Sequence, residues 1–297
     1  MLDSILSVAF LWQTLRISVP YALPALGATF SERGGVVNIA LEGILLMSAF
    51  ATTVGTFYSG EPLIGILCGI TAGGLTALLH GITSVTFKAD QIVSGIAINL
   101  FAIGVTKFSC QLLFSSSSNS ARIVGMEQWE FLSSLPSGIN PFVVATVVLV
   151  LLSNFVLFRT TFGLRLRAVG EHPEAAESLG VNVASMRLMG VLISGVLAGL
   201  GGSWLALDQH NFTDGMSAGR GFIALAAMII GKWNPTGAAV ASLFFGVAES
   251  LTIQLQGSGV PTQFIQAMPY VLTMVVLAGF IGRSTPPAAD GISYDKE

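Results

Sequence analysis

The sequence has few charged residues: Asp, Glu, Lys and Arg make up 10% of its 297 positions, whereas hydrophobic residues make up 53%. A soluble domain carries about 25% charged residues and needs them on its water-facing surface. A surface with so few charges suits lipid instead, where a charged side chain is costly. The net charge of -3 and the scattered Lys and Arg residues exclude a basic patch for nucleic acid.

Cysteine and histidine are also scarce. Cys68 and Cys110 lie in apolar stretches, so we interpret them as small buried residues and not as a disulfide or metal pair. The three histidines lack mutual ligand spacing, so no metal site is predicted. No short apolar core with a small-residue cleavage motif follows the N-terminus, and the first apolar stretch is expected to stay in the mature protein.

Sequence motifs for chemistry are missing as well. The chain has no GxxxxGK(S/T) phosphate-binding loop and no convincing Ser–His–Asp or paired-carboxylate arrangement. We therefore expect no enzyme activity, no catalytic residue and no cofactor bound by this chain. Any ATP that its work requires has to be hydrolysed by a separate chain.

Long apolar stretches fill most of the sequence. A spanning helix needs about 20 mostly apolar residues. Pro20 and Pro24 interrupt the first stretch, and GKWNPTG (231–237) interrupts the seventh. We predict an all-α fold, a polytopic transmembrane helix bundle of about 8–10 helices with broken helices, in a single transmembrane domain over residues 1–283. The candidate spans are 5–30, 37–58, 62–87, 91–114, 141–158, 186–207, 222–256 and 267–282.

The positions of Lys and Arg predict the orientation. The densest basic cluster lies in the loop 159–187, which is therefore expected in the cytoplasm. Counting spans from this loop puts Lys88 and Arg283 on the same side and the stretch 115–140 outside. The side of the N-terminus depends on whether the first stretch crosses fully. Residues 284–297 are polar and contain proline, so we predict a flexible cytoplasmic tail.

Two polar interruptions within apolar sequence echo each other in the two halves. At SERGGVVNIALEG (31–43) and at GKWNPTG (231–237) an apolar helix stops and then resumes. Glycine and polar residues at membrane depth are tolerated only where they face protein or a cavity. Paired interruptions indicate a transport path between halves that resemble an inverted repeat. The alternative is that both are ordinary short loops at the membrane surface.

The basic loop 159–187 contains the signature of a short helix. In GEHPEAAESLG, Pro173 suits a first helical position, and Glu174 and Glu177 lie near the positive end of the helix dipole. Gly180 can end the helix in the left-handed conformation. A helix of about two turns is unstable alone, so it must pack on its own bundle or on a cytoplasmic partner.

Four runs carry a resemblance to a known family. SERGGVVNIALEGILLMSAF (31–50), DQIVSGIAINLFAIGVT (90–106), GLRLRAVGEHPEAAESLGV (163–181) and GKWNPTGAAVASLFFG (231–246) resemble the permease subunits of bacterial ABC importers. The resemblance is to the branch that takes up nucleosides and simple sugars, with a more distant relation to branched-chain amino acid and ribose permeases. It covers nearly the whole chain and is greatest to the second of two non-identical permeases in nucleoside-type importers.

The resemblance implies a multi-pass protein of the bacterial inner, or cytoplasmic, membrane that works by alternating access. It implies a cytoplasmic ABC ATPase that uses the ATP, a second permease subunit in a heterodimer, and an extracytoplasmic substrate-binding protein. It also implies that the short helix is the coupling helix, seated in a groove of the ATPase. The residues of this helix are Glu171, His172, Pro173, Glu174, Ala175, Ala176, Glu177, Ser178, Leu179 and Gly180.

Polar side chains at membrane depth are the candidates for the substrate path, because burying them in lipid is costly. A nucleoside is a neutral, hydrogen-bonding solute, which suits amide side chains. For each candidate the alternative is a hydrogen bond between helices or a contact with the partner permease. The candidates are Asn38, Glu42, Asn99, Lys107, Gln111, Glu249 and Gln254.

Other functions and other roles remain open at this point. Simple sugars or riboflavin-like vitamins are alternative substrates, and an ion-coupled secondary transporter is an alternative class, for which Glu42 and Glu249 are the only good titrating candidates. The adjacent pair Glu32 and Arg33 suits a structural ion pair or an interface. The tryptophans are interpreted as anchors at the membrane surface: Trp12, Trp129, Trp204 and Trp233.

Overall fold

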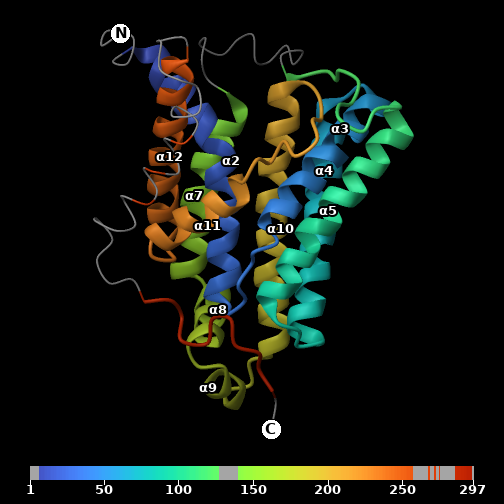
Figure 1. The fold of residues 1–297 in the computed structure, drawn as a ribbon. Coiled ribbons are helices and arrows are strands. Elements are labelled where there is room, and N and C mark those ends of the chain that lie inside the picture. Colours follow the sequence, from blue (N-terminus) through green and yellow to red (C-terminus); the bar gives the residue numbers. More distant parts are fainter. Residues whose placement is uncertain are drawn as a thin grey trace.

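The computed structural model describes residues 7–126, 140–256 and 285–295, together with Ala267, Val271 and Met274. Within these residues all regular elements are helices, and one isolated antiparallel bridge joins Asn119 to Thr213. Figure 1 shows the long helices running side by side as a bundle. The all-α prediction is confirmed. The elements are α2 (Val8–Arg33), α3 (Leu41–Ser59), α4 (Pro62–Gly81), the π-helix η1 (Ile82–Thr86), α5 (Gln91–Phe114), α7 (Pro141–Arg159), α8 (Thr161–Glu171), α9 (Pro173–Ser178), α10 (Val183–Gln209), α11 (Arg220–Ile230) and α12 (Pro235–Leu255).

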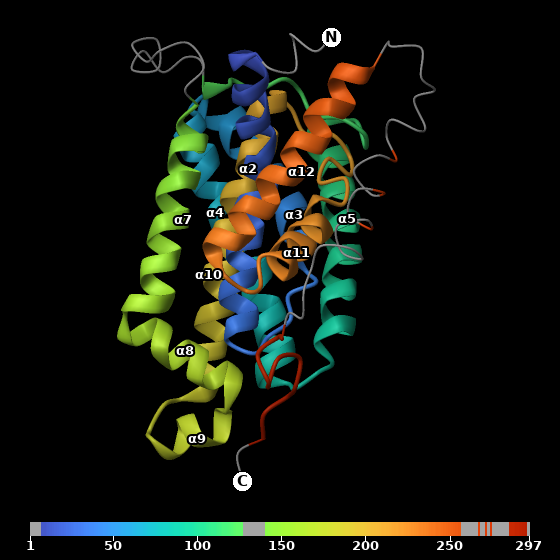
Figure 2. The same ribbon diagram turned by 90° about the vertical axis from the view of Figure 1, so that its left-hand side faces the viewer.

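Six segments of the described chain combine the length and hydropathy of membrane spans: α3, α4 with η1, α5, α7, α10 and α12. Helix α2, with 26 residues, also runs the length of the bundle (Figures 1 and 2). The chain is therefore a multi-pass membrane protein. The predicted span 267–282 lies almost entirely outside the described residues, so the total of about 8–10 helices stays a prediction, as does the inverted repeat.

Helix α2 forms the centre of the bundle. It continues through Pro20 and Pro24, so the predicted interruption at these prolines is wrong. Every residue from Ser18 to Glu32 is buried, because α10, α11 and α12 pack around α2. A proline removes one backbone hydrogen bond of the helix. Outside a helix the neighbouring backbone groups would need water as a partner, and neither lipid nor a packed core offers it. The helices packed around α2 therefore hold the chain in its helical path.

Both polar interruptions are observed. Helix α2 ends at Arg33 and α3 begins at Leu41, which leaves residues 34–40 outside any helix. Helix α11 ends at Ile230 and α12 begins at Pro235, and the turn between them has φ of 57° at Lys232 and 52° at Trp233. Figures 1 and 2 show α11 as a short helix at mid-height in the bundle, beside α12.

Side chains from neighbouring helices bind the exposed backbone groups of the first interruption. The Val37 N–H donates to the side-chain oxygen of Gln91 at 2.7 Å, and the Val37 carbonyl lies 3.0 Å from Nε2 of His80. Asn99 donates to the Ile39 carbonyl at 3.0 Å. Non-helical backbone is tolerated in a membrane protein only when its polar groups are satisfied within the protein. Residues 34–40 are therefore a built part of the bundle.

The two ends of the bundle separate the loops as the charge pattern predicts. Lys88 pairs with Asp295, and Tyr294 donates to Glu177 on α9, so these segments share one end. We call this the α9 end, and Figures 1 and 2 show α8 and α9 projecting there. At the opposite end, Ser120 donates its N–H to the carbonyl of Phe212 at 2.9 Å. Arg283 and residues 127–139 lie outside the described part of the chain.

Two of the tryptophans do not lie at a membrane surface. Trp204 is 2% exposed and Trp233 is 5% exposed. Trp204 packs in the core against Phe142, with ring centroids 5.3 Å apart. The anchor interpretation is wrong for both residues, because tertiary packing and not hydropathy places them. Trp129 falls among the residues that the structure does not describe.

Candidate functional site

Glu42 joins the start of α3 to the start of α11. Its two carboxylate oxygens accept hydrogen bonds from the N–H groups of Gly219 and Gly221, both at 2.8 Å. These N–H groups lie at the start of α11, where they lack helical partners and the helix dipole favours an anion. A Cβ atom on Gly221 would lie 2.4 Å from the Glu42 nitrogen, so this approach requires glycine.

An ion pair lies next to this contact. Nη2 of Arg220, the first residue of α11, lies 2.8 Å from Oε1 of Glu249 on α12, and Tyr21 on α2 donates to the other carboxylate oxygen. The Arg220 guanidinium also lies 6.0 Å from the centroid of the Tyr21 ring. We call these residues, with Glu42, the central cluster.

The ion pair of the central cluster is not fully buried. The side chains of Arg220 and Glu249 are 18% and 21% exposed. Charged groups at this depth are costly against lipid and normally face a water-filled cavity or a polar protein surface. The exposed edge of the pair is therefore suited to a path for a polar solute.

The asparagines on the predicted path have structural contacts. Asn38 donates to the Ser194 hydroxyl at 2.9 Å, and the Asn99 oxygen accepts from the Gly43 N–H at 2.7 Å. Both side chains hold the first interruption in place. The Asn38 Oδ1 atom is buried without a hydrogen-bond partner among the described residues, which leaves one acceptor free at this depth.

The remaining path candidates lie apart from the central cluster. Lys107 pairs with Asp214 at 3.1 Å, a contact between α5 and the loop that precedes α11. Gln111 is exposed in the last turn of α5. The Gln254 Oε1 atom is buried without a partner in the described chain. The structure thus brings Glu42 and Glu249 together through α11, and sequence analysis missed Arg220 and Tyr21, which complete the cluster.

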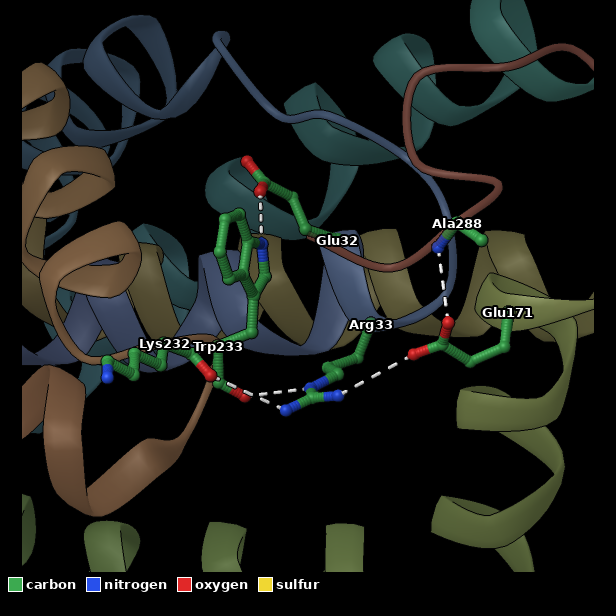
Figure 3. Close-up of polar contacts among 6 residues, drawn as sticks. All are labelled: Glu32, Arg33, Glu171, Lys232, Trp233 and Ala288. Carbon is green, nitrogen blue, oxygen red and sulfur yellow. Dashed lines mark hydrogen bonds and ion pairs between the residues drawn. The ribbon is translucent and has the colours of Figure 1, made fainter. Parts of the chain in front are cut away.

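The two interruptions meet nearer the α9 end, where Trp233 contacts Glu32 and Arg33. The indole N–H of Trp233 donates to Glu32 at 2.6 Å, and Nε of Arg33 donates to the Trp233 carbonyl at 2.8 Å (Figure 3). Arg33 also faces Glu171 at the end of α8, with a nitrogen–oxygen distance of 4.0 Å. Glu32 and Arg33 therefore do not pair with each other, and each connects α2 to a different part of the chain.

The predicted short helix is present as α9, Pro173–Ser178. Gly180 has φ of 81°, and the Val181 N–H returns to the Ala176 carbonyl at 3.1 Å, which ends the helix as predicted. Ala176 is buried against the protein, whereas Glu174 is exposed. The helix α8 was not predicted, although its buried positions Gly163, Leu166, Val169 and Gly170 are spaced three to four residues apart, as on one face of a helix.

The structure describes residues 285–295 of the predicted C-terminal tail. Residues 285–295 lie along the α9 end and make hydrogen bonds with several helices. The Ala288 N–H, for example, donates to Glu171 at 3.2 Å (Figure 3). Polar composition predicted exposure, but it carried no information on the backbone contacts that position this segment.

Comparison with known proteins identifies the family to which the chain belongs. Residues 10–277 match the family described as branched-chain amino acid transport system / permease component. The chain is 41% identical to the guanosine ABC transporter permease protein NupQ of Bacillus subtilis (strain 168), with 95% of each chain covered. It is 43% identical to the nucleoside ABC transporter permease protein NupC of Lactococcus lactis subsp. cremoris (strain MG1363), with 94% of each covered. It is 27% identical to the guanosine ABC transporter permease protein NupP of the same Bacillus subtilis strain, with 93% of this chain and 83% of NupP covered.

Proposed function

The chain belongs to the family of branched-chain amino acid transport system permease components, and from this premise we propose that it is the membrane-spanning subunit of an ATP-driven importer of nucleosides. The observation that carries the substrate class is the identity of 41% and 43%, over nearly the whole chain, to two permeases named for guanosine and for nucleosides. The sequence has no phosphate-binding loop. ATP hydrolysis therefore belongs to a separate ABC ATPase.

We place the α9 end in the cytoplasm of a bacterial cell, with the chain in the inner membrane. The basic loop 159–187 and Lys88 support this orientation. Helix α9 is then the coupling helix, and its exposed residues, Glu174 among them, face the ATPase. A substrate-binding protein delivers the solute to the opposite end.

We propose that the second permease is a different chain. NupQ and NupP both carry the name guanosine ABC transporter permease protein and come from one organism, and this chain is 41% identical to the first but 27% identical to the second. This difference in identity supports a role for the chain as one member of a non-identical pair of permeases. The exposed apolar faces of the described helices then divide between lipid and the partner permease.

The central cluster is our candidate for the solute path. Arg220 and Glu249 lie at mid-height, partly exposed, beside the Tyr21 ring. Hydroxyl, guanidinium and carboxylate groups can exchange hydrogen bonds with the ribose and base of a neutral nucleoside. A shift of the turn 231–234 would move α11, and because Glu42 bonds the start of α11, that movement would also reach α3.

The test is uptake of labelled solutes into proteoliposomes that contain this chain, the partner permease and the ATPase, with the binding protein supplied outside. We expect nucleoside uptake that requires both ATP and the binding protein. ATP-dependent uptake of a sugar or of riboflavin, with no uptake of nucleosides, would show the substrate class to be wrong. Uptake driven by an ion gradient without ATP would show the mechanism to be wrong.

A further inference from the structure

The C-terminal segment 285–295 joins helices that lie far apart in the sequence. In Figures 1 and 2 it runs across the α9 end of the bundle. Within it, Pro287 and Ala289 are buried, whereas most of its other residues are exposed. A segment with this pattern is held on the protein by its backbone and by a few inward side chains.

One set of contacts fixes the segment to α8 and α9. The Ala289 N–H donates to the Gly170 carbonyl at 2.9 Å, and the Ala288 N–H donates to the Glu171 carboxylate at 3.2 Å. The Tyr294 hydroxyl donates to Glu177 on α9 at 2.5 Å. Hydrogen bonds to charged acceptors are stronger than neutral ones. The segment is therefore bonded to the end of α8 and to the end of α9.

A second set fixes the same segment to the bundle. Nη1 of Arg187 on α10, a side chain that is only 2% exposed, donates to the Ile292 carbonyl at 2.7 Å. Asp290 lies beside Glu32 at the end of α2 and faces Arg187. Asp295 pairs with Lys88 in the loop before α5.

The segment also lies directly on the first interruption. A Cβ atom on Gly35 would lie 3.0 Å from the Ala289 carbonyl and 3.1 Å from the Arg187 guanidinium. Gly35 has φ of 84°, so its backbone already requires glycine. Movement of the segment relative to α2 would therefore displace residues 34–40.

We propose that residues 285–295 are a coupling strap that passes the movement of α9 to the first interruption. This inference rests on the proposed function of α9 as the ATPase contact. Packed elements transmit displacement because they deform little. The strap gives α9 a direct connection to α10, to the end of α2 and to the α4–α5 loop, beyond the chain connection through α8.

The experiment compares two strap variants with a matched control in the complete complex. Tyr294→Phe removes the hydroxyl that bonds Glu177, and a chain that ends at Ser284 removes the whole strap. Ser293→Ala is the control, since Ser293 is exposed on the same segment. For each, solute transported per ATP hydrolysed and ATPase activity without the binding protein are measured. The wild-type complex is first shown to import its solute, so that a wrong substrate class is recognised separately.

We expect the truncated complex to hydrolyse ATP while transport per ATP falls roughly fivefold or more, and Tyr294→Phe to give a smaller loss in the same direction. Ser293→Ala should match the wild type. Glu177→Ala combined with Tyr294→Phe should lose no more than either single change. If the truncated chain fails to assemble, Tyr294→Phe alone decides. An unchanged transport-to-ATP ratio in Tyr294→Phe, or equal losses in Ser293→Ala, would overturn the proposal.

Discussion

Trp233 and Glu32 lie 201 positions apart in the sequence and are joined by a hydrogen bond of 2.6 Å between the indole N–H and the carboxylate. Both side chains are buried, at 5% and 4% exposure. Through this bond the end of α2 is fixed to the turn between α11 and α12. The two polar interruptions of the sequence are thus one structural unit, and the central cluster adds a separate contact between α3 and the start of α11.

Replacing Trp233 with phenylalanine should destabilise the protein. The aromatic ring is kept, but Glu32 loses its donor while it remains buried, which costs about 1–3 kcal/mol. Thermal unfolding of the purified protein in detergent measures the effect. Trp12→Phe is the control, because Trp12 lies near the partly exposed start of α2. Equal melting temperatures for the wild type and Trp233→Phe would contradict the importance of this bond.

The interruptions could be predicted from sequence because their cause is local. The dipeptide Asn234–Pro235 disfavours continuation of a helix through Asn234, and Gly35, with φ of 84°, permits the turn after α2. The end of α9 at Gly180 was predictable for the same reason. The prediction failed at Pro20 and Pro24, where the packing of α10 and α12 around α2 overrides the local preference.

The composition of the central cluster could be predicted only in part. Glu42 and Glu249 stand out as acids within apolar sequence, but their link depends on Arg220, which lies 29 positions from Glu249. No periodicity relates an arginine at the start of a short helix to an acid on the next helix. Trp233 was likewise misplaced at the membrane surface, because its partner Glu32 comes from the other half of the chain.

Variants of the Arg220–Glu249 ion pair should change the stability of the protein and its transport activity to different extents. Arg220→Met alone leaves Glu249 without its cation at membrane depth and should cost up to about 3 kcal/mol. The double variant Arg220→Met with Glu249→Leu removes both charges and should recover most of that stability. Thermal unfolding and nucleoside uptake are measured on the same samples. If the double variant regains full uptake along with stability, the pair has only a structural role.

Contact between α9 and the ATPase should depend on Glu174. This residue is exposed on α9, whereas Glu177 also bonds Tyr294 and would report on the strap at the same time. We expect Glu174→Lys to reduce copurification of the ATPase several-fold, because it reverses a charge at the proposed interface. Glu61→Lys, an equivalent change at the opposite end, is the control. Unchanged ATPase association in Glu174→Lys would exclude Glu174 from the interface.

Docking of the strap should weaken as the pH rises. Burial raises the pKa of Asp290 to about 7, although a hydrogen bond with Glu32, the Gly291 N–H and the charge of Arg187 all act in the opposite direction. In a released strap the carboxyl would have its ordinary pKa of about 3.9. The docked form therefore binds the proton more tightly. Its added stability is complete below about pH 4 and is lost as the pH rises through about 7.

Limited proteolysis of the strap across this pH range measures the effect. Cleavage within residues 285–295 should increase from about pH 5 to about pH 8 in the wild type. Asp290→Asn keeps the shape of the side chain but has no proton to lose, so the pH dependence of its cleavage comes from the protease and from the other ionisable groups beside the strap. The ratio of the two rates at each pH removes that common dependence. A ratio that stays constant would show that Asp290 carries its proton equally in the docked and released strap, whereas a ratio that rises towards high pH would show that ionisation of Asp290 loosens the link between α9 and the first interruption.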